Sequence, residues 1–327
     1  MTRAAGFIHR GLSWAIACLA MVAAPCAFAQ DYPYRPIRLL IGFAGGSTAD
    51  IVARLIGQHL GERLGQPIIV EARPGGTGLI ANDAVVKSPP DGYTLGLLSG
   101  GHASTAAIMK KLPYDPVNDF AWISTVIAYP MVIGVVPESP IKSFADLIAR
   151  AKAAPGRISY GSPGIGSIHH LLGEWLNMEA GTNMIHVPFK GEALAFVEVI
   201  AGRVDVMLAT TTFAGNPIRS GKLRPLGITA ARRYALLPEI PPVAETLREI
   251  ELISWQGLMA SPATPPAIID RISRELRAVL ALPEIERRFA EFGGVPAHIS
   301  SAEMRARVER DIVRWKRIVE VKNIERQ

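Results

Sequence analysis

The chain has 327 residues, a formal net charge of +6 and 49% hydrophobic residues. This length suggests about two domains of ~100–200 residues each, and the apolar content excludes an intrinsically disordered chain. The modest charge gives no reason to expect a nucleic-acid partner, and two cysteines exclude a disulfide-rich scaffold and a four-thiolate metal site.

Residues 1–29 are predicted to be a secretory signal peptide. Arg3, His9 and Arg10 precede an apolar run over 11–24, and the triplet Ala-Phe-Ala that ends at Ala29 has the form of a cleavage site. A membrane anchor is the alternative, but the run has only about 14 residues, short of the ~20 that span a bilayer. Both cysteines lie in the removed piece, so the mature chain has no thiol and is expected to be exported and soluble.

The first part of the mature chain alternates between strands and helices. Apolar, β-rich runs predict strands, and apolar residues at i, i+4 spacing predict helices. In chain order these elements are a strand at 37–43, a helix at 51–64, a strand at 68–71, a helix at 79–87 and a strand at 93–98. This order and spacing are typical of a parallel α/β sheet.

The middle of the chain repeats this pattern, and the C-terminal part is mostly helical. The predicted elements are strands at 131–136, 158–160, 185–188, 204–208, 223–229 and 254–260, and helices at 143–153, 169–176, 193–201, 268–280 and 300–318. Extended segments near 123–129 and 252–255 would join two α/β units. We therefore expect two lobes, with lobe 1 formed by 30–128 and 254–327 and lobe 2 by 129–253.

Two Gly/Ser-rich loops each lie between a predicted strand and a predicted helix. They are GGSTAD at 45–50 and SPGIGS at 162–167. In a parallel sheet such loops place unpaired backbone N–H groups at the carboxyl edge, and the helix that follows adds partial positive charge. One loop on each lobe would clamp a carboxylate without an arginine. The alternative is that both are ordinary turns in which Ser47 and Ser167 cap the helices.

Other motifs give weaker signals. Segment 76–81 fits the G-x-G-x-x-A pattern of dinucleotide-binding loops, but its helix is short and an exported protein rarely meets NAD. Tyr160 replaces the first glycine of a serine hydrolase motif around Ser162. His169 and His170 are adjacent, so they point to different helix faces and cannot chelate as an i, i+4 pair. We therefore predict no catalytic residue, no metal site and no cofactor.

Three single residues have both a structural and a functional interpretation. His102 is either a hydrogen-bonded structural residue or part of a pocket edge. Lys190 is either a solvated turn residue or a charge at the mouth of a cleft. Asp205 is expected at a strand end with a hydrogen-bonding role.

A series of ordered motifs makes the chain resemble the tripartite tricarboxylate transporter substrate-binding proteins, also called the Bug family. These motifs cover essentially the whole mature chain and lie at 32–38 (YPYRPIR), 43–54 (FAGGSTADIVAR), 70–75 (VEARPG), 90–95 (PDGYTL), 112–120 (LPYDPVNDF), 187–191 (VPFKG), 202–207 (GRVDVM) and 264–266 (TPP).

The resemblance implies an α/β, type II-like periplasmic-binding-protein fold. Each of its two lobes is a mostly parallel sheet flanked by helices, and a cleft between the lobes closes on a small carboxylate held by loop amides and ordered water. The residues that the resemblance assigns to the ligand are Phe43, Ala44, Gly45, Gly46, Ser47, Asp50, Ser99, Gly100, His102, Ser162, Gly164, Gly166, Ser167, His170, Phe189, Lys190, Gly191 and Asp205.

The sequence thus predicts a monomeric periplasmic receptor that delivers an organic carboxylate to the membrane permease of a tripartite tricarboxylate-type transporter. Its mechanism would be hinge closure, without chemistry. One alternative is a sensor that presents the bound carboxylate to a signalling partner. Another is an exported hydrolase, for which the motifs offer no Ser–His–acid set. A third is the effector domain of a transcription regulator, against which the signal peptide and the lack of an N-terminal helix-turn-helix count.

Overall fold

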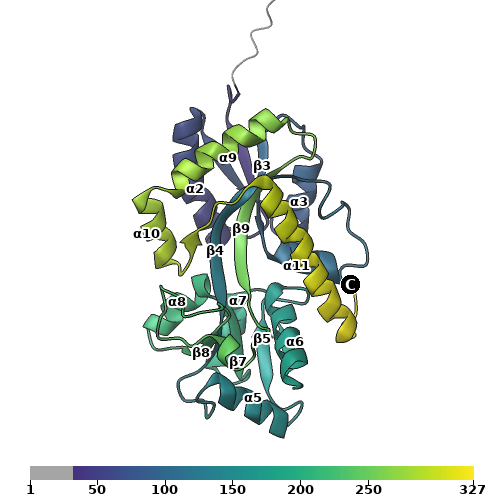
Figure 1. Cartoon of the computed structure of the whole chain (residues 1–327), viewed down its shortest axis with the longest axis vertical. Coiled ribbons are helices and arrows are strands. Elements are labelled where there is room, and N and C mark those ends of the chain that lie inside the picture. Colours follow the sequence, from purple (N-terminus) through teal and green to yellow (C-terminus); the bar gives the residue numbers. More distant parts are fainter. Residues whose placement is uncertain (1–31) are drawn as a thin grey trace, which may run out of the picture. The chain divides into compact units, whose positions relative to one another are not determined.

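The computed structural model describes residues 32–327, and the predicted signal peptide lies outside them. Residues Arg35–Gln327 form one compact unit, which contains a mixed ten-stranded sheet with helices on its faces (Figure 1). The α/β class expected from the sequence is therefore confirmed. In residues 32–327, no helix is both long and apolar enough to cross a membrane.

The first half of the sheet is built from parallel strands. β1 (Ile37–Ile41) lies between β2 (Ile68–Ala72) and β3 (Thr94–Ser99), and β3 also pairs antiparallel with β9 (Ile253–Ala260). Burial of β1 and β3 on both faces explains their continuous apolar sequences. The helices of this half are α2 (Thr48–Leu64), α3 (Leu79–Val86), α4 (Gly101–Ile108), α9 (Pro266–Leu280) and α10 (Pro283–Glu291), with a 3-10 turn η1 (Gly76–Gly78) before α3.

The second half repeats the parallel arrangement. β5 (Ser159–Ser162) lies between β6 (Ile185–Pro188) and β7 (Val206–Thr210), parallel to both. Its helices are α5 (Phe144–Ala153), α6 (Ile168–Ala180), α7 (Glu192–Ile200) and α8 (Thr211–Arg219), with a 3-10 turn η2 at Val243–Glu245. Each half thus presents strand-to-helix loops at the carboxyl edge of its parallel strands.

A single long strand, β4 (Ala121–Val135), runs through both halves (Figure 1). Its residues 121–130 pair antiparallel with β9, and its residues 131–135 pair antiparallel with β7 and β8 (Arg224–Ile228). The short strand β10 (Val295–Pro296) also pairs with β4. The partners of β4 therefore change between residues 130 and 131.

The sequence predicts this strand only from residue 131, ten residues too late. Ser124 and Thr125 interrupt the apolar pattern, yet both are fully buried. Ser124 Oγ donates to the carbonyl oxygen of Ile299 at 2.7 Å, and Thr125 Oγ1 donates to that of Ala297. Hydrogen bonding of these hydroxyl groups lets polar residues lie inside the sheet.

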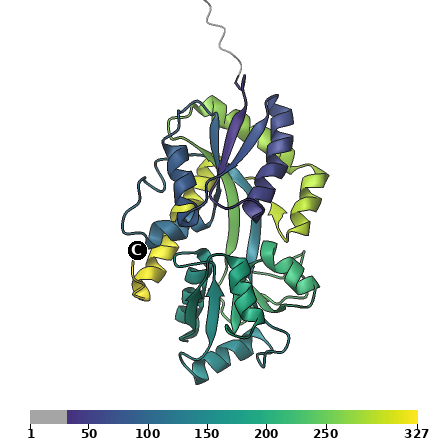
Figure 2. The same ribbon diagram turned by 180° about the vertical axis from the view of Figure 1, so that it is seen from behind.

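Helix α11 (Ser301–Val321) packs against elements of both halves (Figure 2). Its N-terminus has the capping box predicted at Ser300. Trp315 of α11 meets Trp175 of α6 edge-to-face, with ring centroids 6.0 Å apart. Three helices are absent from the predicted set: α4 and α10, and α8, which contains Pro217. The sequence of α4 shows no helical period because all eight of its residues are buried.

Candidate functional site

The loop between β1 and α2 is held by side chains of the helix that follows. Ser47 caps α2 by accepting a hydrogen bond from Asp50 N at 3.3 Å. The carboxylate of Asp50 reaches back and accepts one from Gly46 N at 3.0 Å, and Gly46 has a φ of +80°, which favours glycine. Hydrogen bonds from Arg54 and Gly46 lower the pKa of Asp50. The exposed residues Ala44, Gly45 and Gly46 form the tip of this loop.

The loop between β5 and α6 has the same construction. Ser167 caps α6 by accepting from His170 N at 3.2 Å, and His170 Nδ1 accepts from Gly166 N at 3.2 Å. Gly166 has a φ of +78°. Burial lowers the pKa of His170 to about 4, so the ring is neutral at pH 7 and its Nδ1 can accept. Both loops therefore follow the pattern Gly-Ser-x-x-Asp/His, with the last side chain tied to the glycine amide.

This construction leaves matching amides unpaired in the two loops. Three backbone N–H groups in each loop have no hydrogen-bond acceptor within residues 32–327. They belong to Gly45, Thr48 and Ala49 in the first loop and to Ile165, Ile168 and His169 in the second. Each set lies at the N-terminus of a helix longer than twelve residues, where the helix dipole favours an anion. Chemically, each loop can bind one side of a carboxylate.

The second loop faces elements of the other half of the sheet. A Cβ atom on Gly166 would lie 2.7 Å from Ile108 Cγ2 of α4. A Cβ atom on Gly100, at the start of α4, would lie 3.6 Å from Ile168 Cδ1 and 3.2 Å from Ser254 Oγ. The turn after β3 and the loop after β5 are therefore in close approach.

The turn after β3 borders a small cavity of about 10 Å³, near the lower limit for one water molecule. Phe43, Ser99 and His102 line it, together with two residues that sequence reasoning did not select, Thr77 and Asn82. Thr77 has a φ of +55°, a conformation that costs a residue with a Cβ atom about 1–2 kcal/mol. Such strain is typical of ligand-binding segments and is not visible in the sequence.

The structure gives His102 a clear structural role at this cavity. Its Nε2 lies 2.7 Å from the carbonyl oxygen of Pro116, and its Nδ1 lies 3.3 Å from Asn82 Nδ2. The ring stacks on Tyr114, and burial lowers its pKa to about 4. His102 is therefore neutral and supports the wall of the cavity.

Ser162 and His186 form a serine–histidine contact. Ser162 Oγ lies 2.6 Å from His186 Nε2 and also accepts from Gly164 N at 3.1 Å. The hydroxyl is fully buried, and the imidazole is sandwiched between the rings of His170 and Tyr160. Burial lowers the pKa of His186 to about 3. Among the described residues, no carboxylate is bonded to this ring, so the pair lacks the third group of a hydrolytic triad.

The turn at Phe189, Lys190 and Gly191 lies beside the second loop. Phe189 N donates to Ser162 O at 2.9 Å, and the side chain is half-buried. Lys190 is exposed, and Gly191 precedes α7 with a φ of +116°. The next residue, Glu192, points its carboxylate at His169, a contact that sequence reasoning missed because 23 positions separate the two residues.

Asp205 lies at the opposite edge of the second half. Its Oδ2 accepts from Ser159 N at 2.8 Å and from Ser159 Oγ at 2.7 Å. Both residues stand before or at the start of their strands, whereas the loop at 162–167 follows the end of β5. The structure does not bring Asp205 to the edge where the loops lie, and we leave it out of the proposed site.

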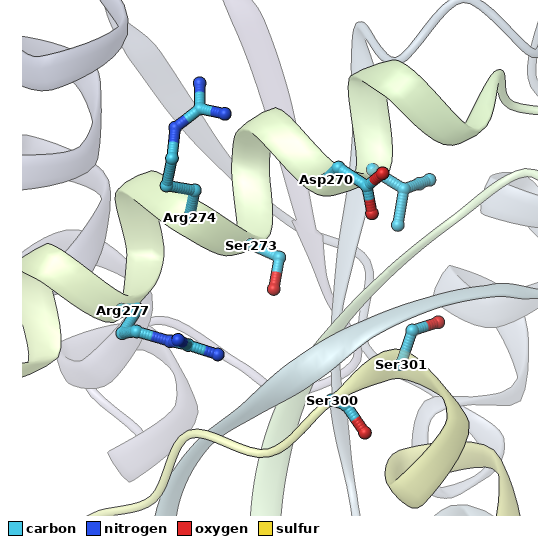
Figure 3. A pocket seen from close by; sticks show the side chains of 7 residues that line it. Asp270, Ser273, Arg274, Arg277, Ser300 and Ser301 are labelled. Atoms are coloured by element: carbon cyan, nitrogen blue, oxygen red, sulfur yellow. The ribbon is translucent and has the colours of Figure 1, made fainter.

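A second cavity, of about 300 Å³, lies elsewhere, between α9 and the start of α11 (Figure 3). Arg274 and Arg277 come from α9, and Ser300 and Ser301 from the start of α11. Ser300 is already bonded to Glu303, and Ser301 Oγ donates to Trp122 O. None of the residues that the sequence assigns to the ligand borders this cavity.

Comparison with known proteins identifies the family. Residues 52–324 match the model of the tripartite tricarboxylate transporter family receptor. Protein BugT of Bordetella pertussis is 34% identical over 302 residues, which cover 91% of this chain and 92% of BugT.

Solved structures give the same answer. Rpa4515 of R. palustris with adipate is 32% identical with a TM-score of 0.82, covering 89% of this chain and 98% of that one. MatC from Rhodopseudomonas palustris with bound malate is 27% identical with a TM-score of 0.79, covering 88% and 100%. The periplasmic binding protein BugD is 29% identical with a TM-score of 0.81, covering 90% and 100%. The chain therefore belongs to the tripartite tricarboxylate transporter receptor family, also known through its Bug members, and has the fold of periplasmic solute-binding proteins.

Proposed function

We propose that this protein is a periplasmic receptor that captures a small organic carboxylate between two lobes. The observation that carries the proposal is the matched pair of loops, each with three unpaired amides at a helix N-terminus. Hydrogen bonds to a charged group contribute about 1.5–3 kcal/mol each, so two such sets suffice for tight binding without a buried arginine or lysine. The family relatives that hold adipate and malate support a carboxylate as the ligand class.

In this proposal the ligand carboxylate lies between the tips of the two loops. Gly45, Gly46 and Ser47 would surround it from one side, and Gly164, Gly166 and Ser167 from the other, with ordered water filling the remaining positions. Asp50 and His170 act through the glycine amides that they fix. The remaining residues would form the wall around the ligand. On the side of the first loop they are Phe43, Ala44, Ser99 and Gly100, with His102 behind them, and on the side of the second loop Ser162, Phe189, Lys190 and Gly191.

Closure of the cleft would bend the two strands that pass between the lobes. We place the division where β4 changes partners, close to the predicted boundary between 128 and 129. Lobe 1 then holds β1–β3 and the C-terminal helices, and lobe 2 holds β5–β8. Hinge movement of this kind traps a ligand without any chemical step.

The partner in this proposal is the membrane permease of a tripartite tricarboxylate-type transporter, which the monomeric receptor meets after export and cleavage behind Ala29. Uptake of the bound carboxylate by cells should be lost when the gene is deleted and restored by the intact chain. Persistence of uptake, together with capture of a membrane signalling protein, would favour the sensor alternative.

Native mass spectrometry of the purified protein, followed by a thermal-shift screen of mono-, di- and tricarboxylates, tests the ligand class. We expect a co-purified acid or a carboxylate that raises the melting temperature by several degrees, because ligand bound only to the folded state stabilises it. Failure of every carboxylate to raise it contradicts the proposal.

The exported hydrolase is kept as a second candidate because Ser162 Oγ lies 2.6 Å from His186 Nε2. A hydrolase should turn over small esters, and Ser162→Ala should abolish the turnover while leaving binding intact. We expect no turnover by the unmodified protein, since the hydroxyl is fully buried.

A further inference from the structure

Glu192 places a carboxylate where three helices of the second half begin. It is the first residue of α7, and its Oε1 lies 3.0 Å from His169 Nε2, on the first turn of α6. The same oxygen accepts from Thr210 N at 2.7 Å, and Thr210 is the N-cap of α8. Helix N-termini favour anions, so the protein fills this anion-binding position with its own side chain.

This carboxylate is close to the proposed ligand site. His169 is the link, because its backbone N–H is one of the unpaired amides of the second loop while its side chain holds Glu192. The side chain of Glu192 is 20% exposed, and among the described residues it forms no ion pair with a lysine or arginine. Glu192 therefore places a negative charge one side-chain contact away from the second loop.

Two further buried atoms lack partners, one of them on His169. His169 Nδ1 and Gln256 Oε1 are both buried without a hydrogen bond within residues 32–327. The amide oxygen of Gln256 is an acceptor, and His169 Nδ1 is one in the tautomer whose Nε2 donates to Glu192. Buried polar atoms of this kind can accept a hydrogen bond from a bound molecule.

Strand register connects Gln256 with Glu192. Gln256 stands opposite both Ser99 of β3 and Ile127 of β4, and Tyr129 of β4 stands opposite Ser254. The hydroxyl of Tyr129 bonds to Ser254 and Gln256, and its pKa is raised mainly by burial and to a smaller extent by the nearby charge of Glu192. Paired and alternate residues share one face of a sheet, so a single polar track leads from the turn after β3 to Tyr129, which lies within range of the charge of Glu192.

We propose that Glu192 makes this receptor select carboxylates whose far end is an uncharged hydroxyl or an ammonium group, and reject those with a second carboxylate there. The inference rests on the proposed function and specifies its ligand class. A hydroxyl or ammonium group would donate to the acceptors on the track, whereas a second anion beside Glu192 is repelled. Repulsion between like charges of only about 1.4 kcal/mol already corresponds to a tenfold loss of affinity.

Calorimetric titration with matched acids tests the proposal. The four-carbon set is 4-hydroxybutanoate, 4-aminobutanoate and succinate, and the six-carbon set is 6-hydroxyhexanoate, 6-aminohexanoate and adipate. For at least one length, we expect the unmodified protein to bind a donor-ended acid at least about tenfold more tightly than the diacid. Glu192→Gln keeps an acceptor for Thr210 N but removes the charge, and should shift this ratio about tenfold towards the diacid.

Glu198→Gln is the matched control, since Glu198 lies on the same helix, is paired with Arg203, and loses the same charge. Its binding ratio should equal that of the unmodified protein. If both acid types bind equally, or if Glu192→Gln leaves the ratio unchanged in a protein with a normal melting transition, the inference is overturned and the receptor function stands. If no acid of either set binds and the wider carboxylate screen is also negative, the receptor function fails and the inference fails with it.

Discussion

Replacement of Asp50 by alanine tests whether the first loop is held for ligand binding. The substitution removes the acceptor of Gly46 N, 3.0 Å away, and the ion pair with Arg54, also at 3.0 Å. The loop amides would then have to be ordered by the ligand itself. We expect weaker binding together with lower stability.

The size of both effects follows from the contacts. A hydrogen bond to a buried charged group contributes about 1.5–3 kcal/mol, whereas the ion pair with the exposed Arg54 adds little because water screens it. The free energy of unfolding should therefore fall by about 2 kcal/mol, which lowers the melting temperature of a chain of this length by about 3 °C. Ligand affinity should fall at least about tenfold, because ordering the loop costs about 1.4 kcal/mol or more.

The chain contains a matched control at the start of α5, which lies at the far end of the second half (Figure 1). There Asp146 N donates to Ser143 Oγ, Lys142 N donates to Asp146 Oδ2 at 2.8 Å, and Arg150 pairs with the same carboxylate. Asp146→Ala breaks the same set of contacts away from the loops. It should lower stability by a similar or smaller amount and leave affinity unchanged.

Urea unfolding and calorimetric titration of both variants provide the measurement. Asp50→Asn should recover most of the affinity, because its amide oxygen can still accept from Gly46 N. Equal losses of affinity in the Asp50 and Asp146 variants would refute the reasoning, since the effect would then be one of stability alone.

Two further predictions concern close packing and pH. Gly166→Ala should lower ligand affinity strongly, because its Cβ would lie 2.7 Å from Ile108 Cγ2; Gly181→Ala, with a φ of +63° and open space around it, should cost only about 1 kcal/mol of stability. Titration and unfolding of the two variants separate the effects, and equal affinities would contradict the first expectation. Burial holds the pKa of three histidines below 6.5, at about 4 for His102 and His170 and about 3 for His186. As the pH falls, these histidines are protonated in the unfolded chain before they are protonated in the folded one. The free energy of unfolding is therefore highest above pH 6.5 and should decrease towards pH 4, by about 3–4 kcal/mol per pH unit near pH 5. Urea unfolding at pH 7, 6 and 5 checks this slope, and a flat profile would show that these rings are not buried in the neutral form.

Sequence reasoning found the two loops because glycine and an N-capping serine leave a strong local signal. The family resemblance pointed to Asp50 and His170, three residues after each cap. The sequence did not show where these side chains point. In the structure each accepts a hydrogen bond from the glycine amide of its own loop, and neighbouring amides of the loop keep no acceptor within the described residues.

The sequence alone could not predict which residues the strand register brings together. Tyr129, Ser254 and Gln256 meet only because β4 pairs with β9, and a buried polar residue in an apolar strand gives no sign of its partner. Helix α4 was missed for a related reason, since a helix buried all round lacks the amphipathic period. Thr77 needed a backbone angle that its sequence does not encode.

The course of β4 has a consequence for how the protein is assembled. Strand β4 is hydrogen-bonded to β9 along residues 121–130 and to β7 and β8 along residues 131–135. Each half of the sheet therefore depends on a strand that it shares with the other half. A fragment cut near residue 128 would leave open strand edges on both pieces. We therefore expect that one half cannot be replaced by the corresponding half of a relative, and that the two halves fold together.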